Sequence, residues 1–440
     1  MAGADYRSVE LTLESRSGRL GLLCASAAAA ALICFAAGRL WLADTRMRSN
    51  QVERMERGAA LVPGDGEPWD RAGHVRQWDL ENPDPAGAIA DYERAVADDP
   101  RSAHYWMDLA SAREDSGDAK GAREAFERAR AAYPASAEVA WNYGNFLVRN
   151  DEVEEGFAQI QQAVRADPNL LPLAISRTWR ANRDVNLLLD RVLPANAEAY
   201  FQALDFFATN RQTDAALAVW ERLLTVQKTF PLSKSFSFLD ELILDGKSEE
   251  AKTVWREALE AAGLPHDAPA GNNAIWNGDF ARDFLNGGLD WRWTPILGAA
   301  IDFDAAPSGG NGRAVRLDFG GGTNVFLEQP TELVPVEPSC AYHFHALMRT
   351  ESISTESGIR FSFTDAGGGT AGMLSTENLT GSQPWTVIEG DLTTGPATHF
   401  LRLRVYRAPS RMFDNKLSGT VWVAEVSLVP TGSDGGQPKR

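Results

Sequence analysis

A repeat of about 34 residues constrains the fold of this chain more than any other feature of its sequence. Pro100, Pro134 and Pro168 are evenly spaced at this period. Three further positions keep the same step, and each carries one kind of side chain: Ala88, Ala122 and Gly156; Tyr92, Phe126 and Ile160; Ala95, Ala129 and Ala163. Four positions in phase over three segments predict stacked helical hairpins rather than a helical bundle with coincidental spacing.

The residue types explain why such segments fold as hairpins. A small residue lets the two helices approach closely, a large apolar residue fills the gap to the next hairpin, and proline ends the second helix. One hairpin cannot bury its apolar face alone, so it has to stack on its neighbours. The pattern resembles the tetratricopeptide repeat family over residues 67–265. The resemblance implies an all-α solenoid of about six hairpins that binds a protein partner.

The later repeats are more degenerate. Residues 169–194 predict a shortened unit with Leu187, Leu188 and Leu189 in its second helix. The pattern then recovers at a step of 35 residues, at which two triplets match: Ala216, Trp220 and Leu223 with Ala251, Trp255 and Ala258.

The net charge and the cysteines exclude some classes of function. The chain has a net charge of −17, so it would repel the phosphates of a nucleic acid, and we predict no such partner. Of its three cysteines, Cys24 and Cys34 lie in an apolar segment and Cys340 lies far away in a strand-like run. These positions predict no disulfide framework, and they do not identify the compartment.

An apolar run near the N-terminus predicts a membrane anchor. Leu20 to Gly38 is a 19-residue run without charge, long enough to span about 28 Å as a helix, close to one bilayer core. Trp41 follows it at the position of an interfacial anchor. A cleaved signal peptide is the alternative, but the long charged leader and the lack of a small-x-small site before Arg39 argue against it.

The sequence pattern of the second half of the chain predicts β-strands. Tyr342, Phe344 and Met348 alternate with polar residues, and glycine clusters supply turns between such runs. Short strands at regular intervals predict an all-β sandwich of jelly-roll type over residues 275–430. The fold class is therefore multidomain, with these parts: tail 1–19, transmembrane helix 20–43, juxtamembrane linker 44–66, tetratricopeptide solenoid 67–265, linker 266–274, jelly-roll sandwich 275–430 and tail 431–440.

Several short stretches resemble carbohydrate-binding-module-like (galactose-binding-like) domains: Asn277-Gly278-Asp279-Phe280, Leu289-Asp290-Trp291 and Gly419-Thr420-Val421-Trp422-Val423. The resemblance implies that the sandwich binds glycan or protein. Family members often hold structural calcium near the termini. Ala281 stands where a glutamate is usual, and Ala424-Glu425 stands where two aspartates are usual. These departures argue against a calcium site here, and no cofactor is expected.

Catalytic motifs are missing from the sequence, which contains neither Gly-x-Ser-x-Gly nor His-Glu-x-x-His. His343 and His345 form a close pair without further ligands nearby in the sequence, so an ordinary polar sheet face explains them better than a metal site, and none is predicted. If the strands lie side by side, one basic face suited to an anionic glycan would hold His343, His345, Arg349, Arg360, Arg402 and Arg404. Trp291, Trp293 and Trp385 would stack on sugars or belong to the core.

Orientation in the membrane is argued from two opposing signals. More arginines follow the apolar run than precede it, namely Arg39, Arg46, Arg48, Arg54 and Arg57 against Arg7, Arg16 and Arg19, which would keep the body in the cytoplasm. The sandwich is of a kind usually found outside, and large domains translocate despite flanking charge. We predict a single-pass protein of the bacterial inner membrane with a periplasmic body.

The most favoured function is a membrane-anchored, non-enzymatic scaffold of the bacterial cell envelope, whose solenoid binds a protein and whose sandwich binds glycan or protein. The alternative is an accessory subunit of surface-polysaccharide assembly or export. A glycan-active hydrolase using unrecognised carboxylates is a third hypothesis, which the lack of a catalytic motif disfavours.

Overall fold

The computed structural model describes residues 16–48, 51–265, 272–309, 312–367 and 372–431. The chain divides into two compact units, Met1–Pro194 and Ala195–Arg440. Most of the predicted tails 1–19 and 431–440, and most of the linker 266–274, lie outside the described residues.

The apolar run forms a single long helix, α1 (Arg16–Met47), which extends beyond the predicted span at both ends. It is long and apolar enough to cross a membrane. Residues 44–66, expected as a linker, contain the end of α1 and a second helix, α2 (Val52–Ala59). Arg46 of α1 donates to the carbonyl of Arg57 in α2 at 3.1 Å, and Arg39 of α1 donates to the carbonyl of Leu61, just after α2, at 2.6 Å.

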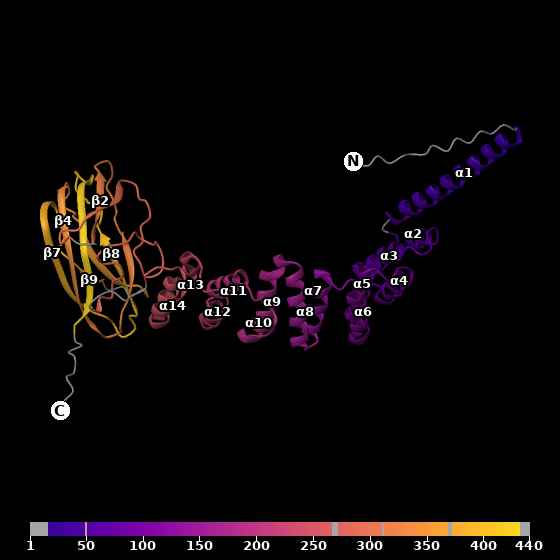
Figure 1. Cartoon of the computed structure of the whole chain (residues 1–440), viewed down its shortest axis with the longest axis horizontal. Helices are drawn as coiled ribbons and strands as arrows, with labels where there is room; N and C mark the ends of the chain where they lie inside the picture. The colour runs from indigo at the N-terminus through magenta and orange to yellow at the C-terminus, as the bar shows by residue number, and fades with distance from the viewer. Residues whose placement is uncertain (1–15, 49–50, 266–271, 310–311, 368–371, 432–440) are drawn as a thin grey trace, which may run out of the picture. The chain divides into compact units, whose positions relative to one another are not determined.

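Four helical hairpins complete the first unit (Figure 1). They pair α3 (Glu67–Trp78) with α4 (Pro85–Asp98), α5 (Ala103–Asp115) with α6 (Ala119–Ala132), α7 (Ala137–Arg149) with α8 (Val153–Ala166), and, after the short η1 (Pro168–Leu170), α9 (Leu171–Ala181) with α10 (Val185–Arg191). The last pair confirms the predicted shortened unit, because α10 has only seven residues.

The repeating positions are buried, as the period predicts. The large apolar residues Tyr92, Phe126 and Ile160 are at most 3% exposed. At the small-residue position, a Cβ on Gly156 would meet the carbonyl of Gly144 at 2.8 Å, so α7 and α8 approach too closely for a larger residue. The helix starts repeat as well, since Asp84 and Asp118 cap α4 and α6 in the same way.

The second unit begins with two more hairpins, α11 (Ala197–Thr209) with α12 (Thr213–Val226), and, after η2 (Leu232–Ser235), α13 (Phe236–Leu244) with α14 (Ser248–Ala261). The two matching triplets of the later repeats are buried, and Trp220 and Trp255 belong to them. The Trp220 indole donates to Glu257 at 2.8 Å, which links α12 to α14. The described chain thus holds six hairpins, as the resemblance implies.

The rest of the second unit is an antiparallel sandwich (Figure 1). Its strands are β1 (Ala299–Ala305), β2 (Arg313–Gly320), β3 (Thr331–Pro335), β4 (Ala341–Ile353), β5 (Arg360–Asp365), β6 (Gly372–Ser375), β7 (Gly381–Thr393), β8 (Phe400–Tyr406) and β9 (Ser418–Pro430). One sheet has the order β1-β2-β9-β4-β7 and the other β3-β8-β5-β6. This order of β2 to β9 confirms the predicted jelly roll, with β1 added at one edge.

The sandwich core lies between the two sheets. Phe344 of β4 meets Phe361 and Phe363 of β5 with ring centroids 4.9 Å apart, and all three side chains are fully buried. The opening Asn277-Gly278 stretch lies beside β9 beyond the end of its pairing with β2, where the amide of Val426 donates to the carbonyl of Gly278 at 2.8 Å. A Cβ at position 278 would lie 2.0 Å from the carbonyl of Val426, so only glycine fits there.

The last hairpin packs on the sandwich within the second unit. Gly287 and Gly288 lie against the rings of Phe236 and Trp255, and a Cβ on either glycine would fall 2.3 Å from the ring. Arg292 pairs with Asp240 of α13. The sandwich and the last helices therefore belong to the same compact unit.

The stacked rings between hairpins give a test of the repeat register. Phe126 lies 5.5 Å from the ring of Tyr143 and 5.1 Å from that of Phe146. Replacing it in Phe126→Ala leaves a cavity between the second and third hairpins and should cost about 3–5 kcal/mol. Urea unfolding followed by helical circular dichroism should show a lower midpoint, whereas Tyr133→Ala, at a residue 58% exposed, should not. Equal midpoints for parent and Phe126→Ala would contradict the register.

Candidate functional site

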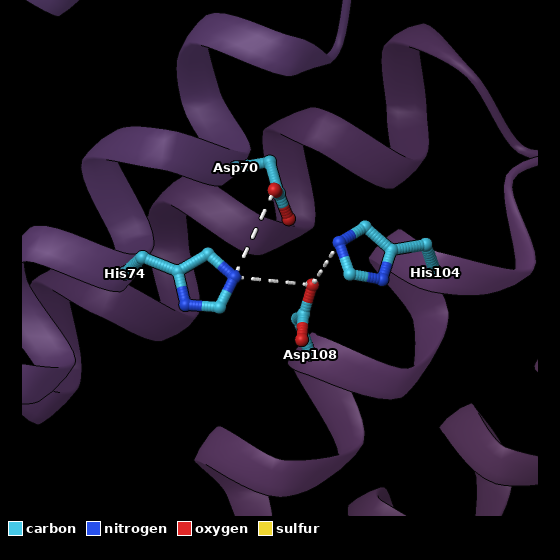
Figure 2. Close-up of side chains that lie close together, drawn as sticks. All are labelled: Asp70, His74, His104 and Asp108. Atoms are coloured by element: carbon cyan, nitrogen blue, oxygen red, sulfur yellow. Dashed lines mark ion pairs between the residues drawn. The ribbon is translucent and has the colours of Figure 1, made fainter. Parts of the chain in front are cut away.

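Two histidines and two aspartates meet on the first helices of the first two hairpins (Figure 2). Asp70 and His74 lie one turn apart on α3, and His104 and Asp108 lie one turn apart on α5. Asp70 and His104 are separated by one repeat period, and so are His74 and Asp108. The period therefore places an aspartate beside a histidine twice. We call these four residues the Asp–His cluster.

The four side chains converge on one point. His74 Nε2 lies 3.4 Å from Asp108 Oδ2 and 3.9 Å from Asp70 Oδ2, and His104 Nε2 lies 3.4 Å from Asp108 Oδ2. One nitrogen or oxygen from each residue lies within 4.8 Å of those from the other three. Among the described residues, this is the group in which three or more histidines, cysteines or carboxylates lie close enough together to share a metal ion.

Burial within the cluster is uneven. The Asp70 side chain is 7% exposed and that of Asp108 is 16% exposed, whereas His104 is 59% exposed and open to solvent. The pKa of Asp70 is raised to about 7, first by burial and then by the nearby Asp108 carboxylate. The hydrogen bond that the His74 imidazole donates to the Asp108 carboxylate raises the pKa of His74. Asp70 Oδ1 is buried and has no hydrogen-bond partner among the described residues.

Two tyrosines pack the helices that carry the cluster against one another. The ring of Tyr92 meets His74 edge-on at 5.6 Å, and its hydroxyl donates to Gln77 at 2.9 Å. Tyr105 lies against Gly66, where a Cβ would fall 2.7 Å from its ring. These contacts lock α3 against α4 and α5, so the cluster sits on packed helices rather than on a loop. None of its four residues belongs to the motifs identified from the sequence.

A cleft of 190 Å³ lies between α7, α8 and α9. Phe157 and Ile160 are among its apolar residues, and Arg149, Arg177 and Arg180 line it as well. Arg149 is already paired with Glu114 at 2.8 Å. Arg177 and Arg180 are exposed and form no ion pair with the residues described. The cleft thus offers two available positive charges next to an apolar floor.

The predicted basic face of the sandwich does not form as one surface. His343, His345 and Arg349 lie on β4 in the five-stranded sheet, but the other three residues of the predicted face, Arg360, Arg402 and Arg404, lie on β5 and β8 in the four-stranded sheet. Alternation along a strand predicts which residues point outward, but not which sheet a strand joins. The jelly-roll connections send β4 and β8 to opposite sides.

The three β4 residues are already engaged with neighbours. His343 Nδ1 lies 2.8 Å from Asp391, and His345 Nδ1 lies 3.4 Å from Glu389. Arg349 lies 4.4 Å from the ring centroid of Trp422 and also pairs with Glu351. These three residues therefore form an ordinary polar face of the five-stranded sheet.

The three arginines of the four-stranded sheet do share a face. The alternating Leu401 and Leu403 are fully buried, so Arg402 and Arg404 point outward, and β5 lies beside β8 with Arg360 opposite Tyr406. Arg404 pairs with Glu328 at 2.6 Å, while Arg402 is exposed. We call Arg360, Arg402 and Arg404 the arginine face.

The tryptophans divide between core and surface. Trp291 is fully buried and packs on Phe280 at 5.3 Å, so it is a core residue and not a sugar platform. Trp293 and Trp385 are partly exposed. A further cavity of 500 Å³ in the second unit is lined by Trp255, Trp276 and other residues of α14 and the sandwich.

Two buried carboxylates near the start of the sandwich are positioned for structure. Asp290 accepts the amide of Leu285 at 2.7 Å, and Glu332 Oε1 accepts the amide of Trp276 at 2.7 Å. Burial raises the pKa of Asp290 to about 6. Burial, with the charge of Asp290 added, raises the pKa of Glu332 well above its usual value. Both groups hold the irregular segment that leads into the strands.

These raised pKa values predict a pH dependence of stability. A carboxyl whose pKa is higher in the folded state stabilises the fold fully below its unfolded pKa, near pH 4, and that stability falls as pH rises through the folded pKa. For Asp290 the loss corresponds to about 3 kcal/mol. Glu332→Gln keeps the acceptor for Trp276 and removes one titration, so its stability should fall less between about pH 4 and about pH 7.

The measurement has to report the unfolding free energy of the sandwich separately from that of the helical repeats. Hydrogen exchange of peptides from β4 and β9 in urea gives the unfolding free energy at each pH for the parent, for Glu332→Gln and for the control Glu377→Gln. Glu377 is exposed, so its variant should follow the parent. A Glu332→Gln protein with the full pH dependence of the parent would contradict the role of this carboxyl.

Comparisons with known proteins identify the repeats. The tetratricopeptide repeat family model matches residues 79–137 and 108–170. The crystal structure of MamA is 16% identical with a TM-score of 0.25, and the match covers 40% of this chain and 85% of MamA. That of YrrB, described as a TPR protein with an unusual peptide-binding site, is 15% identical with a TM-score of 0.26, covering 48% and 94%. No curated protein matches the chain.

The chain therefore contains tetratricopeptide repeats, and proteins built from such repeats act as protein-interaction scaffolds. No catalytic family is indicated by the family match.

Proposed function

We propose that this chain is a membrane-anchored, non-enzymatic scaffold of the bacterial cell envelope that holds a protein partner on its helical repeats. The six hairpins carry this proposal, because stacked repeats present extended surfaces suited to binding another chain. The apolar helix α1 would fix the scaffold in the inner membrane, with the body in the periplasm. The sandwich would add a second binding module for glycan or protein.

The partner segment is expected to be acidic. The cleft between α7, α8 and α9 carries Arg177 and Arg180 on a protein whose net charge is −17. A carboxylate from a partner would pair with these guanidinium groups, while an apolar side chain beside it would rest on Phe157 and Ile160. The general acidity of the scaffold would repel acidic segments elsewhere, which favours this cleft.

Photo-crosslinking in the native membrane tests the cleft. A photoreactive residue at position 145, which lines the cleft, should capture one defined partner from the full-length anchored chain. Arg177→Glu with Arg180→Glu should abolish the crosslinked product by charge reversal. Arg101→Glu with Arg128→Glu makes the same change of charge at exposed sites away from the cleft and should leave it intact. A product that persists in the first variant would reject the cleft as the docking site.

The same cells report the orientation. If the body is periplasmic, protease added to spheroplasts should degrade the crosslinked product, and in sealed inside-out vesicles the product should be protected. The opposite pattern would show that the arginines after the apolar run keep the body in the cytoplasm.

The sandwich is proposed to bind an anionic glycan, as expected for a scaffold or accessory subunit in surface-polysaccharide assembly or export. The arginine face supports this, because three guanidinium groups lie on neighbouring strands of one sheet. Planar guanidinium groups bind carboxylates through paired hydrogen bonds, so uronic acids are the expected ligand class.

A binding experiment with polygalacturonate tests the arginine face. The full chain in detergent should bind this polymer with an affinity that falls as salt is raised. Arg402→Ala with Arg404→Ala should weaken binding without loss of folding. His343→Ala with His345→Ala changes the outer face of the other sheet and should have no effect. Binding that survives the arginine substitutions unchanged would contradict the proposal.

A further inference from the structure

We propose that the Asp–His cluster is a binding site for one divalent transition-metal ion, with Zn²⁺ as the best-fitting ion, which joins the first two helical hairpins. This site is separate from the partner cleft and from the arginine face, so the inference does not rest on the scaffold role. Asp70, His74, His104 and Asp108 supply the ligands.

The spacing of the ligand atoms fits a tetrahedral ion. Zn²⁺ binds imidazole nitrogen and carboxylate oxygen at about 2.0–2.1 Å, which puts neighbouring ligand atoms of a tetrahedron about 3.4 Å apart. The two distances from Asp108 Oδ2, to His74 Nε2 and to His104 Nε2, are both 3.4 Å. The third contact, from His74 Nε2 to Asp70 Oδ2, is 3.9 Å and needs only a small movement.

The chemistry of the ligand set selects the class of metal. Two imidazoles with two carboxylates suit borderline ions such as Zn²⁺, whereas Mg²⁺ and Ca²⁺ prefer oxygen ligands throughout. Each ligand pair sits one turn apart on one face of a rigid helix, the spacing that lets two side chains bind the same ion. Both aspartates and both histidines therefore reach the centre from packed elements (Figure 2).

A buried oxygen without a partner is the second, independent observation. The Asp70 side chain is only 7% exposed, and no described group donates a hydrogen bond to its buried Oδ1 atom. A buried acceptor without a donor is costly, so a cation bound beside it would be favourable. A cation held by the cluster would satisfy the Asp70 carboxylate, while the exposed His104 leaves a path for the ion to enter.

The histidine ligands occur in the first two hairpins and not at the matching positions of the third. The positions one repeat period beyond His104 and Asp108 are Glu138 and Asn142, which supply no imidazole. The ion would therefore link α3 to α5 alone. Direct contacts between the histidines and the two carboxylates would be the metal-free explanation of the same arrangement, and this explanation predicts no response to a metal.

The test is a titration of the full chain in detergent, stripped of metal with a chelator and then titrated with ZnCl₂. Calorimetry should report binding of one equivalent, and thermal unfolding should shift to higher temperature with Zn²⁺ but not with Mg²⁺. No heat and no thermal shift with Zn²⁺ would overturn the proposal. An equal thermal shift with Mg²⁺ would also overturn it, because it would indicate general screening of carboxylates.

Variants assign the binding to the cluster. His104→Asn alters an exposed ligand, so folding should persist, and the affinity for Zn²⁺ should fall at least about tenfold. The control, His343→Asn with His345→Asn, changes two histidines that also lie beside carboxylates and should bind Zn²⁺ like the parent. Unchanged affinity in His104→Asn, or its loss in the control, would place the ion elsewhere and reject the cluster as the site.

Discussion

Within each unit, burial of one hairpin's apolar face against the next hairpin is the interaction on which the repeats depend. Tyr92, Phe126 and Ile160 fill the space between helices and are almost completely buried. A hairpin alone has no other place for these side chains, so the stack forms as a whole. The close contact of Gly144 with Gly156 shows how narrow the spacing is. Surface groups one period apart are consequently held beside one another, which is how separate hairpins come to share a site.

The sequence predicts the features of this fold that depend on local spacing. The repeat period identifies the buried positions of the hairpins, and alternation identifies Leu401, Leu403 and Val405 as core residues of β8, all three of which are fully buried. Neither the repeat period nor the alternation predicts which distant strands pair with one another. The separation of His343 from Arg402 on opposite sheets follows from long connections, and it could not be read from either strand alone.

Buried polar groups were the second feature that local patterns did not identify. Alternation in β8 puts residue 407 on the side of Val405, and Arg407 is indeed fully buried. Its guanidinium donates to the carbonyls of Ser357 and Val325 and to the hydroxyl of Thr355, so it joins segments distant in the sequence. Asp290 and Glu332 act similarly on the segment before β1. Such groups cost desolvation and are retained where irregular backbone needs donors or acceptors.

The Asp–His cluster is the part of the candidate site that can be predicted from the sequence. The apolar residues that repeat at the 34-residue period determine stacking, and they do not include the four ligands. Applied to polar residues, the period pairs Asp70 with His104 and His74 with Asp108. In a stack of repeats, such pairs are neighbours in space for the same reason that the core residues are. A search for ligand residues in a repeat protein therefore has to combine two spacings, one turn within a helix and one period between helices. Only together do they bring four ligands to one point.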